Sequence, residues 1–220
     1  MYPLNLLHHQ QEIFPLFGEQ LEGNPYIFDF SSGNPKTLEF DTTDFDHFQE
    51  IVFSELQASG HQWGIGRYLE ERSTVLLNYP QMIGEGRIYH AGLDIVVPEG
   101  FALHAPMAGR VSHVGKEEEV GSYGGYVVLE HQTASDLFYS LYGHLNSSHL
   151  VKEGDTIEAG QVIGSTGAYS DSGGWFTHTH LQIITELAKS DGRMFQGYIT
   201  ADDLKVIEEL FPSPYPFFRY

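Results

Sequence analysis

The chain has 220 residues, of which 41% are hydrophobic and 14% aromatic, enough for one generous domain or for a core domain with a substantial extension. It contains no cysteine, which excludes disulfides, thiol nucleophiles and cysteine-liganded zinc, so any metal site must use His, Asp or Glu. Thirty acidic against eleven basic side chains give a formal charge of −19, which repels phosphate backbones and anionic lipid headgroups and argues against nucleic acid or membrane partners.

The start of the chain has neither a basic segment nor a continuous apolar run, and no stretch of about 18 apolar residues occurs anywhere. We therefore expect no membrane insertion and a cytoplasmic location for the chain as written. An extracytoplasmic location is the expectation for a processed form. The oligomeric state is not predicted by any feature of the sequence.

Residues 1–84 are predicted to form an α+β extension with one helix. This helix is expected to begin at Thr43, with Asp46 three positions later in a capping-box-like start, and to end at Gly60. A shorter turn or helix is expected around residues 67–72. The apolar stripe of the main helix consists of Phe45, Phe48, Val52 and Leu56.

Residues 85–190 are predicted to form a β-rich domain, because short apolar runs alternate there with Gly, Pro and Asn-Ser clusters. The remaining residues, 191–220, are expected to form a helix followed by a tail rich in Pro and aromatic residues. That helix has Thr200 as its cap and Asp203 at the third position. The strands are expected at residues 93–97, 109–115, 125–131 and 137–145, with two short strands within 151–164.

Three segments far apart in the sequence place histidines where a zinc hydrolase needs them. A catalytic zinc site has three protein ligands and leaves the fourth corner to water. His90, Asp94 and one histidine of the pair His178 and His180 are candidates for these ligands. His144 and the remaining histidine of that pair are then available to transfer protons.

Strand geometry favours this grouping. Positions two apart in a strand share a face, so His178 and His180 are expected to point the same way. His90 and Asp94, four apart, share a face in a strand or a helix, and Gly92 between them lets the backbone pass close to a ligand. His144 is expected on the strand face that carries Phe138, Ser140 and Tyr142.

Residues about 86–184 resemble the bacterial lysostaphin-type (LytM-domain) zinc metallopeptidases, a family of peptidoglycan endopeptidases. Residues 87–100 are similar to the first ligand segment of that family, residues 139–145 to the segment with the middle histidine, and residues 151–167 to a glycine-punctuated hairpin. The resemblance implies a mainly β fold with a LytM/lysostaphin-like antiparallel sheet core, related to the biotinyl-lipoyl-type hybrid fold. An α+β N-terminal extension and a C-terminal helix are expected to flank that core.

The same resemblance assigns His90, Asp94 and His180 as ligands of one Zn²⁺ per chain, and His144 and His178 as the catalytic pair. It implies hydrolysis of a peptide bond, in a peptidoglycan crosslink or a Gly-rich peptide, by metal-activated water. Because the chain has no H-E-x-x-H motif, a histidine must take the proton of that water. Which of His144 and His178 is the base is left open.

One departure from the family pattern concerns the substrate. Trp175 and Phe176 stand before the last histidines, where the family has a small, open rim, and this puts the usual substrate in question. The alternative function is a cytosolic zinc hydrolase or accessory LytM-like domain acting on a non-wall substrate. A regulatory binding module is disfavoured because every ligand is present, and a biotinyl or lipoyl carrier because Lys152 lies at the wrong place for the carrier lysine.

The extension has two interpretations. It packs on the β core, or it inhibits the domain by placing a side chain in the open corner of the metal site. Asn34, in a Ser-Ser-Gly-Asn-Pro turn, is the first candidate for such a plug, and His8 and His9 are weaker ones.

Overall fold

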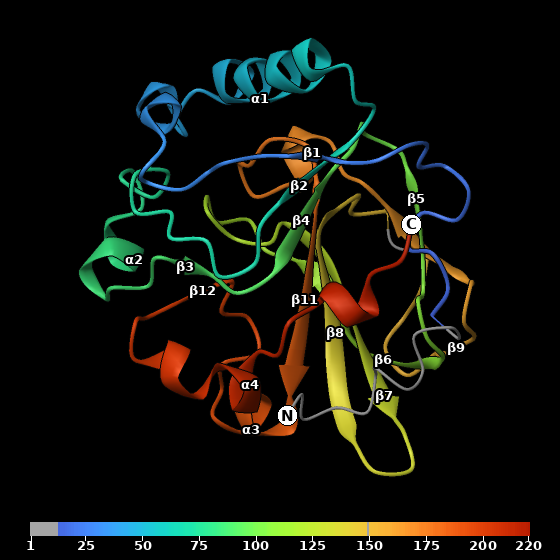
Figure 1. Cartoon of the computed structure of the whole chain (residues 1–220). Coiled ribbons are helices and arrows are strands. Elements are labelled where there is room, and N and C mark those ends of the chain that lie inside the picture. The colour runs from blue at the N-terminus through green and yellow to red at the C-terminus, as the bar shows by residue number, and fades with distance from the viewer. Residues whose placement is uncertain (1–12, 149) are drawn as a thin grey trace.

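The computed structural model describes residues 13–148 and 150–220. In this part of the chain an eight-stranded sheet runs through the centre of the molecule (Figure 1). Only the edge strand β1 and its neighbour β2 pair in parallel, and the other neighbours are antiparallel. From edge to edge the strands are β1 (Tyr26–Ile27), β2 (Gly64–Gly66), β4 (Leu93–Val96), β11 (Thr179–Thr185), β8 (Leu137–Leu145), β7 (Gly125–Gln132), β6 (Gly109–Lys116) and β9 (Thr156–Ile157).

Two small antiparallel sheets and several short helices complete the fold. The small sheets pair β10 (Val162–Ser165) with β5 (Ala102–His104) and β12 (Tyr198–Ile199) with β3 (Tyr89–His90). The α-helices are α1 (Phe45–Ser59), α2 (Pro80–Gly84), α3 (Glu186–Ser190) and α4 (Ile207–Leu210). The 3₁₀ turns are η3 (Pro35–Glu39), η4 (Tyr169–Asp171), η5 (Asp203–Val206) and η6 (Tyr215–Phe217). The fold is therefore mainly β, with an α+β N-terminal part, as the resemblance implied.

The helix of the N-terminal extension is α1. Its N-cap is Asp44, whose side chain accepts a hydrogen bond from the His47 backbone N–H at 3.1 Å, so the predicted cap at Thr43 was wrong by one residue. Gly60 ends the helix in the left-handed conformation (φ 76°). The predicted apolar stripe is confirmed, with Phe48 fully buried and Phe45 only half-buried.

The C-terminal helix differs from its prediction. Thr200 and Asp203 exchange the hydrogen bonds of a capping box, Thr200 N to Asp203 Oδ2 at 2.9 Å and Asp203 N to Thr200 Oγ1 at 3.3 Å. The turns that follow are the 3₁₀ turn η5 and the four-residue α4 rather than one α-helix. The predictions missed α3, which is capped by Thr185 directly after β11.

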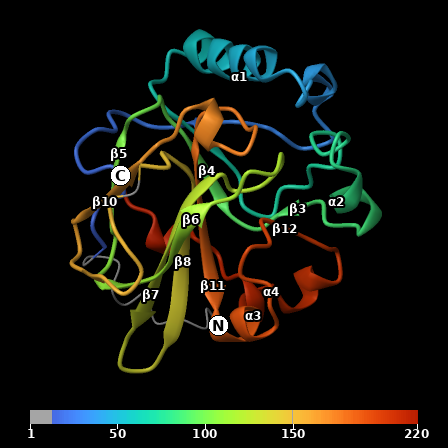
Figure 2. The same ribbon diagram turned by 180° about the vertical axis from the view of Figure 1, so that it is seen from behind.

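The central sheet is covered by apolar clusters on both faces. Leu181 and Ile183 of β11 belong to one cluster, and Ile184 to another that also contains Ala188 of α3 and Leu210 of α4. A third cluster joins α1 to β4 and to the loop before β11. In Figures 1 and 2, α1 lies at one end of the molecule, and α3 and α4 lie at the other end.

The extension is joined to the sheet by backbone pairing. β2 pairs with β4 in a register that places Gly66 opposite Asp94 and Gly64 opposite Val96. The extension therefore packs on the β core and adds two strands to it. The division of the chain at residues 84 and 190 stays a prediction.

In the part of the chain that the structure describes, no helix has the length and hydropathy needed to cross a bilayer.

His131 of β7 is a buried histidine far along the sheet from the other motifs. Its Nδ1 donates to the Ala108 carbonyl at 2.9 Å, its Nε2 lies 2.7 Å from the Ser140 hydroxyl, and its ring stacks on Phe138. Burial lowers the pKa of this imidazole to about 4. The histidine is therefore neutral in the folded protein at neutral pH.

This pKa predicts an acid-dependent loss of stability. Below about pH 6.5 the unfolded chain binds a proton at His131 that the folded chain does not bind until about pH 4, so the free energy of unfolding falls across this window, by about 3 kcal/mol from this group. His131→Gln is expected to reduce the slope of stability against pH by about one proton. Denaturant unfolding of both proteins between pH 7 and 4, with a chelator present, measures the slopes. Equal slopes would contradict the assignment.

Candidate metal and catalytic site

Five of the side chains singled out from the sequence meet at one end of the central sheet. His180 of β11 lies opposite Asp94 of β4 and opposite Gly143 of β8. His90 comes from β3, which is held beside the sheet by pairing with Tyr198 of β12. The two further residues are His178, directly before β11, and His144, near the end of β8.

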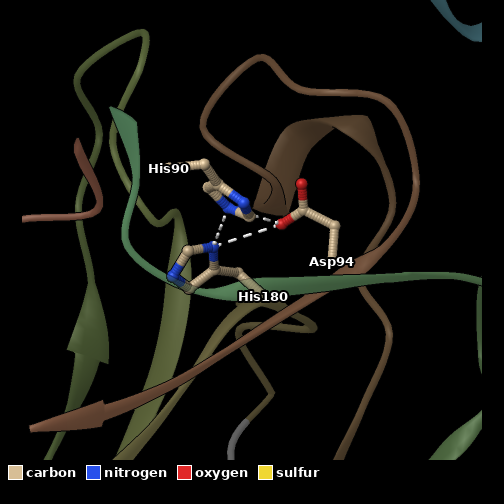
Figure 3. Close-up of side chains that lie close together, drawn as sticks. All are labelled: His90, Asp94 and His180. Carbon is tan, nitrogen blue, oxygen red and sulfur yellow. Dashed lines mark hydrogen bonds and ion pairs between the residues drawn. The ribbon is translucent and has the colours of Figure 1, made fainter. Parts of the chain in front are cut away.

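His90, Asp94 and His180 form a compact cluster of possible metal ligands (Figure 3). His90 Nε2 lies 3.0 Å from His180 Nδ1 and 3.1 Å from Asp94 Oδ1, and His180 Nδ1 lies 3.2 Å from the same oxygen. Ligand atoms around a tetrahedral zinc ion, with bonds of about 2.0–2.1 Å, are about 3.3–3.4 Å apart. The three donor atoms thus fit a tetrahedral ion with little movement, and all three side chains are buried.

His90 and Asp94 reach this cluster by a route that the spacing did not predict. They do not share the face of one strand, because β3 ends at His90 and β4 begins at Leu93. Gly92 lies in the break between the strands, and a Cβ atom there would lie 2.3 Å from His180 Nε2. Glycine at this position thus lets the backbone pass close to the imidazole of His180, and the approach to a bound ligand stays a prediction.

Hydrogen bonds on the far side of each ring determine which nitrogen faces the cluster. His90 Nδ1 lies 2.9 Å from the carbonyl of Arg67, and His180 Nε2 lies 3.0 Å from Oε1 of Gln182. Both partners are acceptors, so these two nitrogens carry the protons of the neutral rings. Burial lowers the pKa of His90 to about 4, with a further contribution from Arg72. Two nitrogen lone pairs and a carboxylate oxygen therefore converge, which is an arrangement that suits a cation.

The Asp94 carboxylate divides its two oxygens between different partners. Oδ1 faces the histidines, whereas Oδ2 accepts a hydrogen bond from Nη1 of Arg72 at 2.7 Å. Burial opposes ionisation of Asp94, but the attraction of His90 and Arg72 outweighs it and holds the pKa of the carboxyl well below its usual range. Asp94 is therefore ionised at neutral pH.

Arg72 was not among the residues singled out from the sequence. The region around residues 67–72 was expected to be a turn or short helix, and it is a turn followed by an isolated bridge between Glu71 and Tyr89. No spacing rule links Arg72 with Asp94, because the contact joins residues 22 apart in different segments. The one local signal is the alternation of charges from Arg67 to Arg72, which an exposed turn also shows.

His178 and His144 lie next to the cluster with their rings 4.3 Å apart. His178 Nδ1 donates to the carbonyl of Phe176, and His144 Nδ1 donates to the carbonyl of Ser172, both at 2.7 Å. Each ring is thereby left with Nε2 as a proton acceptor. His178 Nε2 lies 3.4 Å from Asp94 Oδ1, and burial, reinforced by His178, holds the pKa of His144 well below its usual value.

His144 reaches the site because of a backbone irregularity. Two residues of β8, Gly143 and His144, lie opposite the single Tyr126 of β7, and His144 has a φ of 61°. The predicted alternation placed His144 on the face of Phe138, Ser140 and Tyr142. That prediction was wrong: Phe138 and Tyr142 point into the core cluster on one face of the sheet, and the bulge turns His144 to the face of His180.

The cluster lies at the base of a pocket whose wall comes partly from the extension. Phe30 and Phe48 contribute to this wall together with Trp175 and Phe176. Trp175 stacks on Tyr79 at 5.0 Å and donates its indole N–H to the Ser122 carbonyl at 3.2 Å. Phe176 stacks on His178 at 4.5 Å and contacts both Phe30 and Phe48. The bulky residues noticed in the sequence therefore form an aromatic wall between the extension and the pair His144 and His178.

Asn34 lies away from this pocket. Its side chain caps η3, accepting from the Lys36 backbone N–H at 3.2 Å and donating to the Asp29 carbonyl at 2.6 Å. The interpretation in which Asn34 occupies the open corner of the candidate metal site is therefore wrong. His8 and His9 lie outside the described residues.

Comparison with known proteins shows which family the central part of the chain is similar to. Residues 88–192 match the profile of peptidase family M23. The match makes this part of the chain similar to the LytM-type domains of that family.

Individual relatives cover smaller shares of the chain. The uncharacterized lipoprotein YgeR of Escherichia coli (strain K12) is 34% identical over 77 residues, which are 35% of this chain and 28% of the lipoprotein. A zinc-containing peptidase from Vibrio cholerae is 28% identical and superposes with a TM-score of 0.36 over 44% of this chain and 28% of its own. The catalytic domain of the antimicrobial peptidase lysostaphin from Staphylococcus simulans is 22% identical, with a TM-score of 0.42 over 59% of this chain and 78% of its own. The chain thus spans less than a third of the first two relatives.

Proposed function

We propose that this chain is a zinc-dependent metallopeptidase that hydrolyses a peptide bond, with one zinc ion held by His90, Asp94 and His180. The observation that carries the proposal is the convergence of two imidazole lone pairs and a carboxylate oxygen within 3.2 Å of one another. Three buried acceptors at this separation repel one another unless a cation lies between them. Membership of residues 88–192 in a peptidase family supports zinc as that cation.

We assign proton transfer to His178 and His144. Zinc, when bound, supplies a Lewis acid that polarises the substrate carbonyl and makes water more acidic. His178 Nε2 lies nearest to the ligand cluster, 3.4 Å from Asp94 Oδ1, and is placed to take a proton. His144 lies beside it on a separate strand and is placed to donate a hydrogen bond or a proton to the substrate.

The substrate that we propose is a peptide of the peptidoglycan-crosslink or Gly-rich type. The family match and the naming of the Escherichia coli relative as a lipoprotein both support an extracytoplasmic wall substrate. One observation favours the alternative, a non-wall substrate: the pocket wall is built from Phe30, Phe48 and Trp175, so access to the site is narrowed by aromatic side chains. Small or slender peptides suit that opening in either case.

The experiment is a comparison of the full chain after chelation and after reloading with one equivalent of zinc. Each form is incubated with pentaglycine, with crosslinked peptidoglycan fragments and with a panel of soluble peptides, and new amino termini are identified by mass spectrometry. Zinc-dependent cleavage of the wall peptides is the expected result. Cleavage restricted to the soluble peptides would favour the alternative, and no zinc-dependent cleavage of any peptide would contradict the proposal.

Removing the extension is expected to damage the protein rather than activate it. β2 pairs with the strand of Asp94, and Phe30 and Phe48 are buried against Phe176, so a chain starting at Gly84 exposes an apolar surface and frees a sheet edge. We expect low solubility and no gain in hydrolysis, whereas Asn34→Ala should match the full chain. Size-exclusion chromatography and the peptide assay check both. A soluble truncated chain with raised activity would contradict this expectation.

A further inference from the structure

Arg72 is a buried cation in contact with a candidate metal ligand. Its side chain is 4% exposed, its Nη1 donates to Asp94 Oδ2 at 2.7 Å, and its Nε donates to Glu70 Oε2 at 2.9 Å. The guanidinium lies 5.0 Å from the centre of the Phe30 ring. One side chain therefore bridges two buried carboxylates, a geometry that the planar fork of arginine allows.

Glu70 balances the charge of this arginine. Its carboxylate is 2% exposed and also accepts hydrogen bonds from the Arg67 side chain at 2.6 Å and from the Phe30 backbone N–H at 3.1 Å. A lone arginine beside a cation site would repel the cation. Paired with Glu70, Arg72 supplies a directed donor to Asp94 with little net charge of its own.

The segment that carries Glu70 and Arg72 is fixed to the strand of His90. Leu69 N donates to the His90 carbonyl at 2.8 Å, His90 N donates to the Glu70 carbonyl at 3.0 Å, and Arg72 N donates to the Ile88 carbonyl at 2.8 Å. This segment lies before residues 88–192, which match the family profile. The ligand cluster is thus braced by residues outside the family domain.

A glycine on β2 provides the space for the pair. Gly66 lies opposite Asp94, and a Cβ atom there would lie 2.8 Å from Arg72 Nη2 and 3.1 Å from Asp94 Oδ2. The extension thus supplies both the arginine and the gap into which its ion pair fits.

We propose that Arg72, held by Glu70, is a positioning residue that occupies Oδ2 of Asp94 so that only Oδ1 is available to the metal ion. The inference rests on the proposed metal site. Because a carboxylate can bind a metal through one oxygen or through both, occupation of Oδ2 determines the coordination number as well as the orientation of the ligand. The extension thereby completes the metal site of the family domain.

A purely structural ion pair makes a different prediction. Loss of such a pair lowers the stability of the fold and leaves the metal geometry of the folded fraction unchanged. The test therefore uses metal affinity and the visible absorption of bound cobalt(II), because four-coordinate cobalt(II) absorbs more strongly than five- or six-coordinate cobalt(II). Thermal unfolding of each metal-free variant separates a loss of folding from a change at the site.

The experiment compares Arg72→Met, Arg72→Lys and Glu70→Gln in the full chain, with Arg193→Met as the matched control. Arg193 also forms an ion pair with an aspartate, Asp203, and this pair is partly exposed and does not line the pocket. We expect Arg72→Met to weaken zinc binding about 10- to 100-fold and to reduce the cobalt absorbance, as the loss of partners behind metal ligands usually does. Arg72→Lys should weaken binding as well, because a single ammonium nitrogen cannot occupy the positions of both Nε and Nη1.

Glu70→Gln keeps the shape of the side chain that contacts Arg72. It tests the effect of the Arg72–Glu70 pair on metal binding if Arg72→Met does not fold. It leaves the arginine charge unbalanced beside the metal and loosens its orientation, so zinc binding should again weaken. Wild-type affinity and cobalt absorbance in Arg72→Met or Glu70→Gln would overturn the proposal, as would full rescue by Arg72→Lys. Failure of the wild-type chain itself to bind zinc would overturn the proposed function and this inference together. That outcome is distinguishable from a failure of the inference alone, because it is seen with the wild-type chain before any variant is measured.

Discussion

His90→Ala and Asp94→Ala are each expected to abolish zinc binding, whereas the unaltered chain should bind about one zinc ion per molecule. Each substitution removes one of three ligand atoms that lie 3.0–3.2 Å apart. The two remaining atoms leave the ion open to solvent and cannot complete a tetrahedral site. Metal content after dialysis, measured by atomic emission, checks the expectation.

His113→Ala is the matched control, because His113 lies outside the ligand cluster and contacts Ser112 and Phe195. It should retain the wild-type zinc content. Of the two ligand variants, His90→Ala has the simpler interpretation, since Asp94→Ala also removes one of the two carboxylates that Arg72 contacts. Full zinc occupancy in either ligand variant would refute the assignment of these ligands.

His144→Ala and His178→Ala are expected to keep zinc and to lose hydrolysis by at least about 100-fold, the usual scale for a general acid or base. Neither residue belongs to the three-atom ligand cluster. In each ring Nδ1 is bonded to a backbone carbonyl, which leaves Nε2 available for proton transfer. Zinc content and kcat are measured on the same preparations. Zinc loss in either variant would show that the division between ligands and proton carriers is wrong.

The backbone at His144 calls for a second variant there. Alanine at a φ of 61° is strained, whereas asparagine adopts the left-handed region more readily, so His144→Asn separates loss of the imidazole from distortion of the bulge. Both variants should lose activity to a similar degree. Wild-type activity in His144→Asn would refute a role for this imidazole in proton transfer.

The regular elements followed from local patterns. The strand expected at residues 137–145 coincides with β8. The helix that ends at Gly60 was also predicted, although its start was placed one residue too early. Apolar periodicity and turn-forming glycines are patterns of a few consecutive residues, so the strands and the helix that they favour can be predicted from the sequence directly. The sequence did not predict the short helix α3 or the division of the C-terminal helix into η5 and α4. Such short helices depend on packing rather than on intrinsic propensity.

The chemical inventory of the site was also present in the sequence. Histidine and aspartate are the residue types that bind zinc when cysteine is absent, and their spacing on expected strands grouped His90, Asp94 and the pair before and in β11. The structure brings these residues together at the position where β4, β11 and β8 lie side by side. Residue type therefore supplied the candidate ligands without knowledge of the fold, whereas the choice of His180 over His178 came from the family resemblance.

The direction of His144, the partner of Asp94 and the location of Asn34 depended on the tertiary structure. The bulge that turns His144 arises because β8 has one more residue than β7 between two paired positions. The sequence of either strand alone does not reveal this difference. Arg72 meets Asp94 only because a segment of the extension pairs beside the strand of His90. Asn34 is bound by its own turn and cannot reach the pocket. Contacts between distant segments depend on the summed packing of the whole chain, whereas each residue type carries its chemistry wherever it lies.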